Sequence, residues 1–561
     1  MEPKLWISQI EFSDGNRISF SNNAIVVFVG PNNAGKSATL KESSNLLVTK
    51  NTKTKVIKSI SLSTTGNATE VRAFVEGISK TRYTSNADPH LEGLGFSIYS
   101  AAITNWWSNV GDGIDELSKA FAKYLTTEER LTAANPAPNI KLTSEPAQHP
   151  INFLQKSDSL EKKFSDYFRQ AFGLDLIVHR NAGKEVPLYV GNTPPIVSGQ
   201  DRLSEAYQIE LEKLDLLHEQ GDGMRSFVGV LLNVFISYRS LLFIDEPEAF
   251  LHPPQARLLG KMLAKDLPSD RQLLLATHSS DFLKGLLESN TSNLKIVRVE
   301  RQGNINKVSV LDNTDIKAIW NDSLLRHSNI LDGLFHSQVI ICESDSDCRF
   351  YSAIQDAIHE KANTLSPDTL YLHCGGKHRL PIVIKALKKL NVKMKVVADF
   401  DILNDTNPLK DVWEVSGGIW TDIEKDWKIV KAAIESKRPE LESVELKEEI
   451  DAIFLSTAEK IIPKEKIALI QKALKKTSAW THAKEVGKSF IPSGDPTQAF
   501  ERLSLNLKNK NIFVVEVGEL ESFCKSVGNH GPRWVNDVLV KDLSNDPELN
   551  IARLFITEVT A

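Results

Sequence analysis

The residues best suited to chemistry in this chain are carboxylates that follow apolar runs. One such run, Leu241-Leu242-Phe243-Ile244, leads into Asp245-Glu246-Pro247-Glu248. This pattern predicts a parallel strand buried on both faces, and ligands of open α/β sheets bind at the carboxyl ends of such strands. Asp245 is expected to hold Mg²⁺ through water, and Glu246 to orient or deprotonate the water that attacks a γ-phosphate.

A phosphate-binding pattern precedes this run in the chain. The apolar run from Ala24 to Val29 leads directly into Gly30-Pro31-Asn32-Asn33-Ala34-Gly35-Lys36-Ser37, and a helical pattern follows. G-x-x-x-x-G-K-S between a strand and a helix is typical of P-loop nucleotide-binding proteins. Backbone N–H groups of the loop would close around phosphates, Lys36 would reach the β- and γ-phosphates, and Ser37 would ligate Mg²⁺. The sequence therefore predicts an ATP site.

A glycine-rich turn, Gly221-Asp222-Gly223-Met224-Arg225-Ser226, stands before an apolar helical pattern and before the carboxylate run. ATP-binding-cassette (ABC) proteins place their signature loop there, at a helix N-terminus that contacts the γ-phosphate held by a partner subunit. Gly221, Gly223 and Ser226 are then expected to bind nucleotide across a dimer. A plain turn that caps a core helix is the alternative.

His278 closes the next apolar run, at residues 272–277. At the end of that strand it is expected to sense the γ-phosphate, although a lone histidine is more often structural. Residues 85–200, between the two halves of this site, show a mainly helical pattern and are interpreted as an insertion. The pair Trp106-Trp107 within it is either a stacking platform for bases or, as is commoner for large aromatic residues, part of the core.

A second acidic site is predicted beyond residue 335. Three apolar runs, at residues 337–342, 369–374 and 393–398, end in Glu343, Gly375-Gly376-Lys377 and Asp399-Phe400-Asp401, and Asp347 follows Glu343. Carboxylates at the ends of neighbouring strands converge, and they repel one another unless Mg²⁺ or Mn²⁺ neutralises them. Asp399 and Asp401, two apart, are expected to share one face of a strand and one ion. A solvated loop is the alternative.

A late apolar run, at residues 511–517, leads into Glu519 and Glu521, which are expected to complete a second ion. Two ions about 4 Å apart stabilise the attacking and leaving oxygens of a phosphodiester. The stretch before it, at about 405–510, is rich in lysine and glutamate and has a helical pattern. Its lysines are either solvated or follow a phosphate backbone, and the candidates are Lys425, Lys428 and Lys431.

The composition is that of a soluble globular protein. The 561 residues are 41% hydrophobic and 25% charged, with a net charge of −5, and they suffice for about three or four domains. Without an apolar run of membrane-spanning length or a signal-like N-terminus, a cytoplasmic protein with no membrane partner is expected. Cys342, Cys348, Cys374 and Cys524 show no C-x-x-C pairing, which argues against a zinc site or a disulfide framework.

Taken together, the motifs resemble those of the OLD (overcoming lysogenisation defect) family of ATP-dependent nucleases. They are the P-loop, Asp245 to Glu248 with Leu251-His252-Pro253, Glu343 with Asp347, and the Asp399/Asp401 pair. The resemblance covers nearly the full length, and the combination is more specific than either half. It implies an α/β fold in which an ABC-type P-loop ATPase domain with a helical insertion precedes a Toprim (Rossmann-like) domain with its own helical insertion.

Four segments are expected on this basis. They are residues 1–84, with the P-loop; 85–200, the helical insertion and dimerisation region; 201–330, the rest of the ATPase; and 331–561, the Toprim nuclease domain with its insertion at about 405–510. The resemblance implies an ATP-regulated, metal-dependent DNA endonuclease or nickase that acts as a homodimer or higher homo-oligomer, often in anti-phage defence. Relatives include the nuclease subunit of Gabija systems and effectors paired with retrons. A helicase, or a reverse transcriptase with its RNA and DNA, is therefore an expected partner.

By the same resemblance, Glu343 and Asp347 match the family's first acidic pair. Asp399 and Asp401 match its Asp-x-Asp, and Glu519 and Glu521 match its late acidic motif. The family also has a late lysine near the scissile phosphate, for which Lys541 and Lys377 are the candidates. Two other interpretations stay open. One is a DNA-clamping ATPase whose Toprim domain is a scaffold, although six converging acids argue against it. The other is a topoisomerase-like enzyme, which needs a tyrosine nucleophile.

Overall fold

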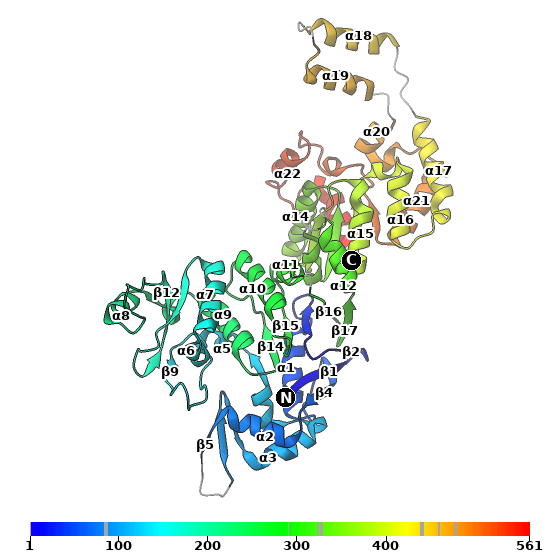
Figure 1. The fold of residues 1–561 in the computed structure, drawn as a ribbon. Helices are drawn as coiled ribbons and strands as arrows, with labels where there is room; N and C mark the ends of the chain where they lie inside the picture. The colour runs from blue at the N-terminus through cyan, green and yellow to red at the C-terminus, as the bar shows by residue number, and fades with distance from the viewer. Residues whose placement is uncertain are drawn as a thin grey trace. The chain divides into compact units, whose positions relative to one another are not determined.

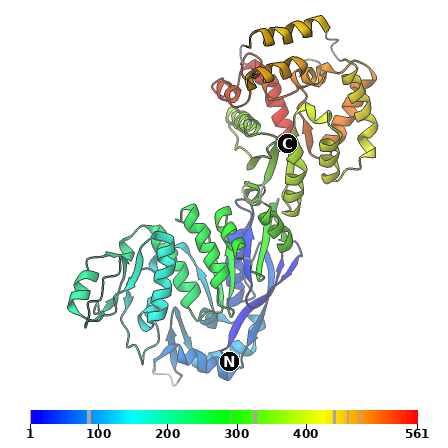
Figure 2. The same cartoon turned by 45° about the horizontal axis from the view of Figure 1, so that its top comes forward.

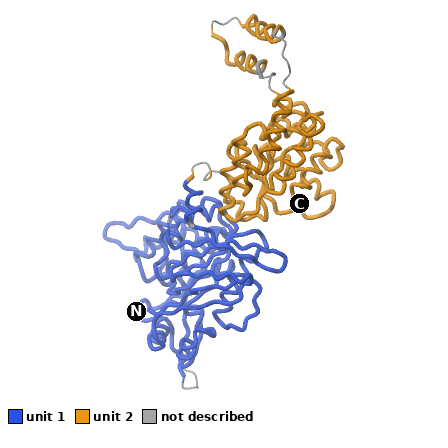
Figure 3. Tube along the Cα trace, turned by 90° about the vertical axis from the view of Figure 1, so that its right-hand side faces the viewer, with its two compact units in different colours: residues 1–321 blue, residues 322–561 orange. Residues whose placement is uncertain are grey.

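The structure is a computed structural model that divides into two compact units, residues 1–321 and 322–561 (Figure 3). It describes residues 2–82, 88–289, 291–322, 325, 329–437, 443–457, 461–475 and 479–561. The boundary expected between residues 84 and 85 lies outside the described residues, and the division into four segments stays a prediction. Among the described helices, none combines the length and the apolar character needed to cross a membrane.

Unit 1 is built on a six-stranded sheet with the order β17-β16-β3-β15-β14-β8. Its strands are β3 (Ile25–Val29), β8 (Ala122–Leu125), β14 (Leu241–Asp245), β15 (Gln272–Ala276), β16 (Leu294–Gln302) and β17 (Ile305–Leu311). All neighbours are parallel except β16 and β17, which form a hairpin. Because β3 lies between β15 and β16, segments far apart in the sequence share one sheet, as the adjoining blue and green strands show (Figure 1, Figure 2).

The central strands are apolar because both faces of the sheet are covered. Every residue of β3 and β15 is buried. The helices that follow the strands are α1 (Lys36–Val48), α10 (Pro253–Asp266) and α11 (Ser280–Glu288). A Cβ added to Gly260 of α10 would lie 2.3 Å from the carbonyl oxygen of Phe282, so α10 and α11 touch at backbone distance. Since β3, β15 and β14 are parallel, the P-loop, His278 and Asp245 meet at one edge.

A second sheet of unit 1 is antiparallel and has the order β2-β1-β4. Its strands are β1 (Lys4–Phe12), β2 (Arg17–Ser19) and β4 (Ile57–Thr65). Gln272 at the start of β15 exchanges two hydrogen bonds of 2.9 Å with the backbone of Ile7. The side chain thereby fastens β1 to the main sheet.

The segment expected to be a mainly helical insertion is mixed instead. Its helices are α3 (Ser100–Ser108), α4 (Ser118–Phe121), α5 (Thr127–Thr132), α6 (Ile151–Lys156) and α7 (Asp158–Phe172). Its strands, besides β8, are β6 (His90–Gly93), β7 (Phe96–Tyr99), β9 (Ala137–Pro138), β10 (Asp175–Val178), β11 (Glu185–Val186) and β12 (Leu188–Gly191). The prediction is wrong because strands of two to four residues are too short to show an alternating pattern.

The pair Trp106-Trp107 belongs to the core. Trp107 is 7% exposed, its ring lies 4.9 Å from that of Phe121, and its indole N–H donates a 2.9 Å hydrogen bond to the carbonyl oxygen of Gly66. Trp106 packs against the same core and is partly buried. The core interpretation is therefore correct for this pair.

Unit 2 contains a four-stranded parallel sheet with the order β19-β18-β20-β21. Its strands are β18 (Gln338–Cys342), β19 (Thr369–His373), β20 (Met394–Ala398) and β21 (Ile512–Val514), and helices α14 (Asp345–Ala362) and α15 (Leu380–Lys389) follow the first two. β21 ends three residues earlier than expected because the chain turns, with the N–H of Gly518 bonded to the carbonyl oxygen of Val515 at 3.0 Å. All four strand ends lie at the same edge of the sheet.

The described residues between β20 and β21 form helices and turns. The helices are α16 (Thr406–Val415), α17 (Thr421–Glu435), α18 (Ser443–Leu455), α19 (Lys464–Lys475), α20 (Ala479–Val486) and α21 (Asp495–Lys508), and after β21 come α22 (Pro532–Val538) and α23 (Asn550–Thr560). Lys428 forms an ion pair of 2.8 Å with Glu424, and Lys431 donates a 2.7 Å hydrogen bond to the carbonyl oxygen of Asn404. Both ammonium groups therefore have partners within α17 or beside it.

Candidate nucleotide and metal sites

The P-loop closes at the carboxyl end of β3. Gly30 and Gly35 adopt φ angles of 149° and 101°, and a Cβ added to Gly30 would lie 2.0 Å from the carbonyl oxygen of Val299. Only glycine fits this close approach of β16. The ammonium of Lys36 donates hydrogen bonds to the carbonyl oxygens of Gly30 and Pro31, at 2.8 and 2.9 Å. Lys36 therefore lies across the loop, as a phosphate-binding lysine should.

A cavity of about 870 Å³ opens beside the loop, within the usual size range of cofactor pockets. Its expected lining residues are Asn32, Asn33, Ala34, Gly35, Lys36, Ser37 and Glu246. The sequence analysis missed Lys55, Arg301, Asn304 and Asn306, which also line it. Three of these come from β16, β17 or the turn between them, where no motif marks a binding residue. The site has room for a nucleotide.

Asp245 ends β14 and faces the loop. The hydroxyl of Ser37 donates a 3.0 Å hydrogen bond to Asp245 Oδ1, so the two expected Mg²⁺ ligands lie side by side. Burial raises the pKa of Asp245, while the Ser37 hydroxyl and the positive charges of Arg130 and Lys36 oppose the rise. Hydroxyl and carboxylate oxygens suit a hard cation such as Mg²⁺.

Arg130 of α5 is a site residue that the sequence analysis missed. It is fully buried, and its guanidinium donates a 2.6 Å hydrogen bond to the carbonyl oxygen of Asp245. Burial lowers the pKa of Arg130, and the charges of Glu248, Asp245 and Glu246 oppose that change. A single arginine on a short helix gives no pattern, so only the structure shows that it holds the end of β14.

Glu246 is turned toward the cavity. Its φ of 47° is rare for a residue other than glycine and costs on the order of 1–3 kcal/mol. Its carboxylate lies 3.2 Å from Nδ1 of His278, at the end of the neighbouring strand. Glu248 is 6% exposed and accepts a 2.6 Å hydrogen bond from the hydroxyl of Thr277. These contacts link the ends of β14 and β15.

The expected signature loop forms the start of α9 (Asp222–Leu231), with Gly221 preceding its first turn. Gly221 is exposed, and within the described part of the chain no atom lies within 4 Å of the position of its Cβ. A Cβ added to Gly223 would instead lie 2.8 Å from the carbonyl oxygen of Phe250. Ser226 is fully buried, so its expected contact with a partner's nucleotide is wrong. It shares a helix face with Gly229, where α9 meets the backbone of Arg130.

The first acidic group of unit 2 consists of Glu343, Asp399 and Asp401, whose carboxylate oxygens lie within 4.8 Å of one another. The expectation that Asp399 and Asp401 share a strand is wrong, because β20 ends at Ala398. The 3₁₀ turn Phe400–Leu403 brings them together instead. The N–H of Asp399 donates a 3.0 Å hydrogen bond to Glu343 Oε1, which ties the ends of β18 and β20 to each other.

Asp347 lies in the first turn of α14 and is 7% exposed. Its carboxylate accepts a 2.8 Å hydrogen bond from the N–H of Ser344, in a capping box that begins the helix. Burial raises the pKa of Asp347, and the negative charge of Glu521 raises it further. Asp347 in turn raises the pKa of Glu343 and of Asp399, so its carboxylate is coupled to both acidic groups.

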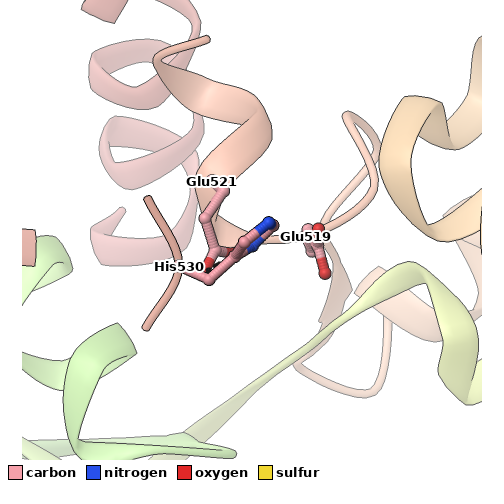
Figure 4. A group of neighbouring side chains, drawn as sticks. All are labelled: Glu519, Glu521 and His530. Atoms are coloured by element: carbon pink, nitrogen blue, oxygen red, sulfur yellow. Dashed lines mark ion pairs between the residues drawn. The ribbon is translucent and has the colours of Figure 1, made fainter. Parts of the chain in front are cut away.

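The second acidic group consists of Glu519, Glu521 and His530, whose oxygen and nitrogen atoms also lie within 4.8 Å of one another (Figure 4). Glu521 Oε1 accepts a 2.7 Å hydrogen bond from the N–H of Gly531 and lies 3.7 Å from Nδ1 of His530. The sequence analysis missed His530, which is in a loop beyond the acidic motif. All three residues line a cavity of about 410 Å³.

Lys484 of α20 lies between the two groups and was also missed. Its Nζ is 3.5 Å from Asp399 Oδ2, 3.9 Å from Asp401 Oδ2 and 3.7 Å from Glu519 Oε2. Burial lowers the pKa of Lys484, but these negative charges outweigh burial and raise it. One lysine in a lysine-rich helical stretch carries no signal that would distinguish it from its neighbours.

The two lysines named from the resemblance have different positions. Lys377 Nζ lies 3.1 Å from Asp401 Oδ2 and 2.9 Å from Asp405 Oδ2, at the rim of the first acidic group. Lys541 lies 2.9 Å from Asp546 Oδ2 and 3.2 Å from Glu548 Oε2, and none of its ion pairs among the described residues joins it to the six expected carboxylates. The geometry therefore favours Lys377 over Lys541.

The residues of unit 2 fit divalent cations. Among the described residues, Oδ1 of Asp401 is buried and has no hydrogen-bond partner, so this oxygen remains available to a ligand. Carboxylate oxygens are the ligands that Mg²⁺ and Mn²⁺ prefer. The imidazole of His530 would also suit Mn²⁺ at the second group, since imidazole is a ligand for transition metals.

The carboxyl group of Glu343 gives a pH-dependent prediction for the metal-free protein. Burial, with the negative charges of Asp401 and Asp347, raises its pKa from 4.5 to about 7. Between pH 4.5 and about pH 7, Glu343 is protonated in the folded chain and ionised in the unfolded chain. The free energy of unfolding therefore falls as the pH rises toward 7. Glu343→Gln removes this pH-dependent fall in stability, because glutamine does not ionise. In EDTA, we expect the variant and wild type to melt alike at pH 5 and the variant to melt higher at pH 8.

Thermal melts of both proteins between pH 5 and pH 8 measure this difference. An equal gap in melting temperature at both ends of the range would contradict the raised pKa of Glu343. Adding Mn²⁺ at pH 8 should raise the melting temperature of wild type, because a bound cation neutralises the converging charges.

Residues 25–283 match the AAA_21 family, described as "AAA domain, putative AbiEii toxin, Type IV TA system". The range contains the P-loop, Asp245 and His278. The match and the parallel sheet together show that unit 1 contains a P-loop ATPase domain of mixed α/β fold.

Two curated relatives are nucleases by name. Old nuclease of Escherichia phage P2 is 24% identical over 172 residues, which are 30% of this chain and 28% of the relative. OLD nuclease of Thermus scotoductus is 25% identical over 200 residues, 33% of this chain and 36% of the relative. The chain thus spans about a third of the length of the curated relatives it matches.

Among solved structures, the SMC head bound to the C-winged helix domain of ScpA is 13% identical, covers 55% of this chain and 99% of that chain, and has a TM-score of 0.34. A score this low supports no inference about function. The sequence matches nevertheless confirm the resemblance that the motifs predict: the chain is similar to two OLD nucleases over about a third of its length, and residues 25–283 carry a P-loop ATPase domain.

Proposed function

We propose that this protein is an ATP-regulated, divalent-metal-dependent DNA endonuclease or nickase that cuts at the acidic groups of unit 2. The observation that carries the proposal is the convergence of six carboxylates at the ends of β18, β20 and β21. Buried like charges are costly, and cations that neutralise them would make such a site useful for phosphodiester chemistry. A parallel sheet with acids at these strand ends is also what a Toprim domain would have.

Divalent ions bound at the two groups would stabilise the attacking and leaving oxygens of a phosphodiester. Glu343, Asp399 and Asp401 would hold one ion, and Glu519 and Glu521 the other. The chain fixes these ligands before substrate arrives, because the N–H groups of Asp399 and Gly531 hold the carboxylates of Glu343 and Glu521. Lys377 at the rim would attract a phosphate oxygen of DNA.

In unit 1, the P-loop, Ser37 and Asp245 would bind ATP with Mg²⁺. Glu246, whose orientation is fixed by its contact with His278, would accept the proton of the attacking water. ATP can regulate cutting only if it binds one arrangement of the subunits better than another. We propose that this arrangement is a homodimer in which the exposed start of α9 closes on the partner's nucleotide.

Gly221 provides a test of the dimer. No atom of the residues that the structure describes lies within 4 Å of its Cβ position, so Gly221→Val should leave the melting temperature and ATP binding unchanged. A bulky side chain would nevertheless keep the start of α9 away from a partner's phosphate. We expect ATP-dependent dimerisation to weaken by about tenfold or more, a loss of about 1.4 kcal/mol.

Sedimentation velocity with ATP, in the hydrolysis-deficient Glu246→Gln background, measures this effect. Gly77→Val is the matched control, because Gly77 is another exposed glycine with no atom within 4 Å of its Cβ position. Dimerisation that survives Gly221→Val would rule out contact through this loop.

The nuclease activity is tested with supercoiled plasmid, purified protein and either Mg²⁺ or Mn²⁺, with and without ATP. We expect nicked or linear product that EDTA abolishes and that ATP changes in rate. Product without added metal, or no effect of ATP, would contradict the corresponding part of the proposal. A covalent protein–DNA adduct on a denaturing gel would indicate a topoisomerase instead.

The resemblance to the OLD nucleases also leads us to propose a role in bacterial defence against phage, with a helicase or a reverse transcriptase as partner. Plaque counts on cells that express wild type or Asp399→Asn, each with the neighbouring genes, test it. Equal plaque counts for the two proteins would contradict a defence role for unit 2.

A further inference from the structure

Lys484, a lysine of the helical stretch between β20 and β21, forms ion pairs with both acidic groups. Its ammonium pairs with Asp399 and Asp401 of the first acidic group and with Glu519 of the second. The side chain of Lys484 is 37% exposed, and that of Lys488, one turn later, is 36% exposed. Lys488, however, pairs with Glu501 and Glu516, outside both groups. The two lysines are about equally exposed, but Lys484 alone of the two pairs with carboxylates of the acidic groups.

Two glycines allow α20 to bring Lys484 to the carboxylates. Gly518 has a φ of 118°, and a Cβ added there would lie 2.1 Å from the carbonyl oxygen of Lys484. Gly487 has a φ of 61°, and its Cβ would lie 2.1 Å from the carbonyl oxygen of Glu516. Larger residues at either position would separate the end of α20 from the turn after β21.

Hydrogen bonds fasten the same contact. In the turn after β21, the carbonyl oxygen of Glu516 accepts a 2.8 Å hydrogen bond from the N–H of Lys488. The carbonyl oxygen of Gly518 accepts one of 2.8 Å from the N–H of Phe400. Ser522 donates a 2.8 Å hydrogen bond to the carbonyl oxygen of Glu485. The end of α20, the Asp399–Asp401 turn and the Glu519–Glu521 turn are thus joined into one structure around the ammonium.

We propose that Lys484 is a tethered counter-ion, which neutralises the converging carboxylates before metal binds and competes with divalent cations for them. The inference rests on the proposed function, because it requires that the acidic groups bind metal. An ammonium within 4 Å of the ligand oxygens of two groups repels any cation that those oxygens attract. Lys484 therefore lowers the metal affinity of unit 2 and stabilises its metal-free form.

One consequence concerns the helical stretch between β20 and β21. Lys484 belongs to that stretch, and the carboxylates lie at the edge of the sheet. The distance between the ammonium and the carboxylates therefore depends on the position of α20 relative to the sheet. Any ligand that shifted α20 would change the affinity of the acidic groups for metal. The insertion would then set when unit 2 becomes competent to bind ions.

Calorimetric titration of nucleotide-free protein with Mn²⁺ at pH 8 tests the proposal. The variants are Lys484→Met, which removes the charge, Lys484→Arg, which retains it, and the matched control Lys488→Met. We expect Lys484→Met to bind Mn²⁺ about tenfold or more tightly than wild type. Lys484→Arg and Lys488→Met should bind as wild type does.

Thermal melts supply a second readout. Lys484→Met should melt below wild type in EDTA and gain more than wild type from saturating Mn²⁺, which also shows that the variant is folded. Folded Lys484→Met with unchanged or weaker Mn²⁺ binding would overturn the proposal. If wild type binds no more Mn²⁺ than Asp399→Asn does, the metal-dependent nuclease function fails, and the inference about Lys484 fails with it.

Discussion

Asp399→Asn is expected to lose DNA cutting by about 100-fold or more while it hydrolyses ATP at the wild-type rate. Asp399 joins the ends of two strands, because its N–H holds Glu343 and its carboxylate lies beside Lys484. The amide of asparagine has the same size but lacks the charge that a divalent ion requires. Loss of supercoiled plasmid and release of phosphate, measured on one preparation, give both rates.

Asp345→Asn is the matched control for this loss. Asp345 lies two residues before Asp347, but its side chain is 57% exposed and pairs with Arg349 at 2.8 Å. We expect Asp345→Asn to cut DNA at nearly the wild-type rate. Equal losses in the two variants would show that general damage to α14 and its surroundings, and not metal binding by Asp399, explains the result.

Glu246→Gln is expected to slow ATP hydrolysis by about 100-fold or more without loss of nucleotide binding. Glu246 lines the P-loop cavity, and its carboxylate lies 3.2 Å from Nδ1 of His278, where we propose that it acts as the general base. Glutamine retains the size of the side chain and cannot accept the proton. Binding of a fluorescent ATP analogue and the rate of phosphate release separate the two effects.

Lys36→Ala provides the contrast, since it removes the ammonium that lies across the loop and should weaken binding itself. In the presence of ATP, Glu246→Gln should cut DNA at the rate of ATP-bound wild type, because the variant keeps its ATP bound. Hydrolysis by Glu246→Gln at the wild-type rate would exclude Glu246 as the base. Asp399→Asn serves as the folded reference with intact hydrolysis.

The strands that carry both sites were predictable because each is a short apolar run that ends in polar residues. Apolar residues at every position of β3 and at the first four positions of β14 reflect burial on both faces, which a sequence shows directly. The P-loop was predictable for a related reason, since a side chain at Gly30 would meet the backbone of Val299 and one at Gly35 would meet the side chains of Asn306 and Val56. Local patterns of this kind need no knowledge of the rest of the fold.

Residues that reach a site from distant segments were not predictable. Arg130 contacts Asp245 across 115 positions of sequence, and Lys484 contacts Asp399 through a helix of the insertion. Nothing in the local sequence distinguishes either from an ordinary charged residue. The pairing of Asp399 with Asp401 was expected for the wrong reason, because a 3₁₀ turn and not strand alternation brings them together.

Our central proposal is that unit 2 cuts DNA with ions held by its converging carboxylates. The most direct test is Mn²⁺-dependent cleavage of supercoiled plasmid by wild type, Asp399→Asn and Asp345→Asn at equal concentration. We expect wild type and Asp345→Asn to cut the plasmid and Asp399→Asn not to cut it under the same conditions. Cutting by Asp399→Asn at the wild-type rate would contradict this proposal.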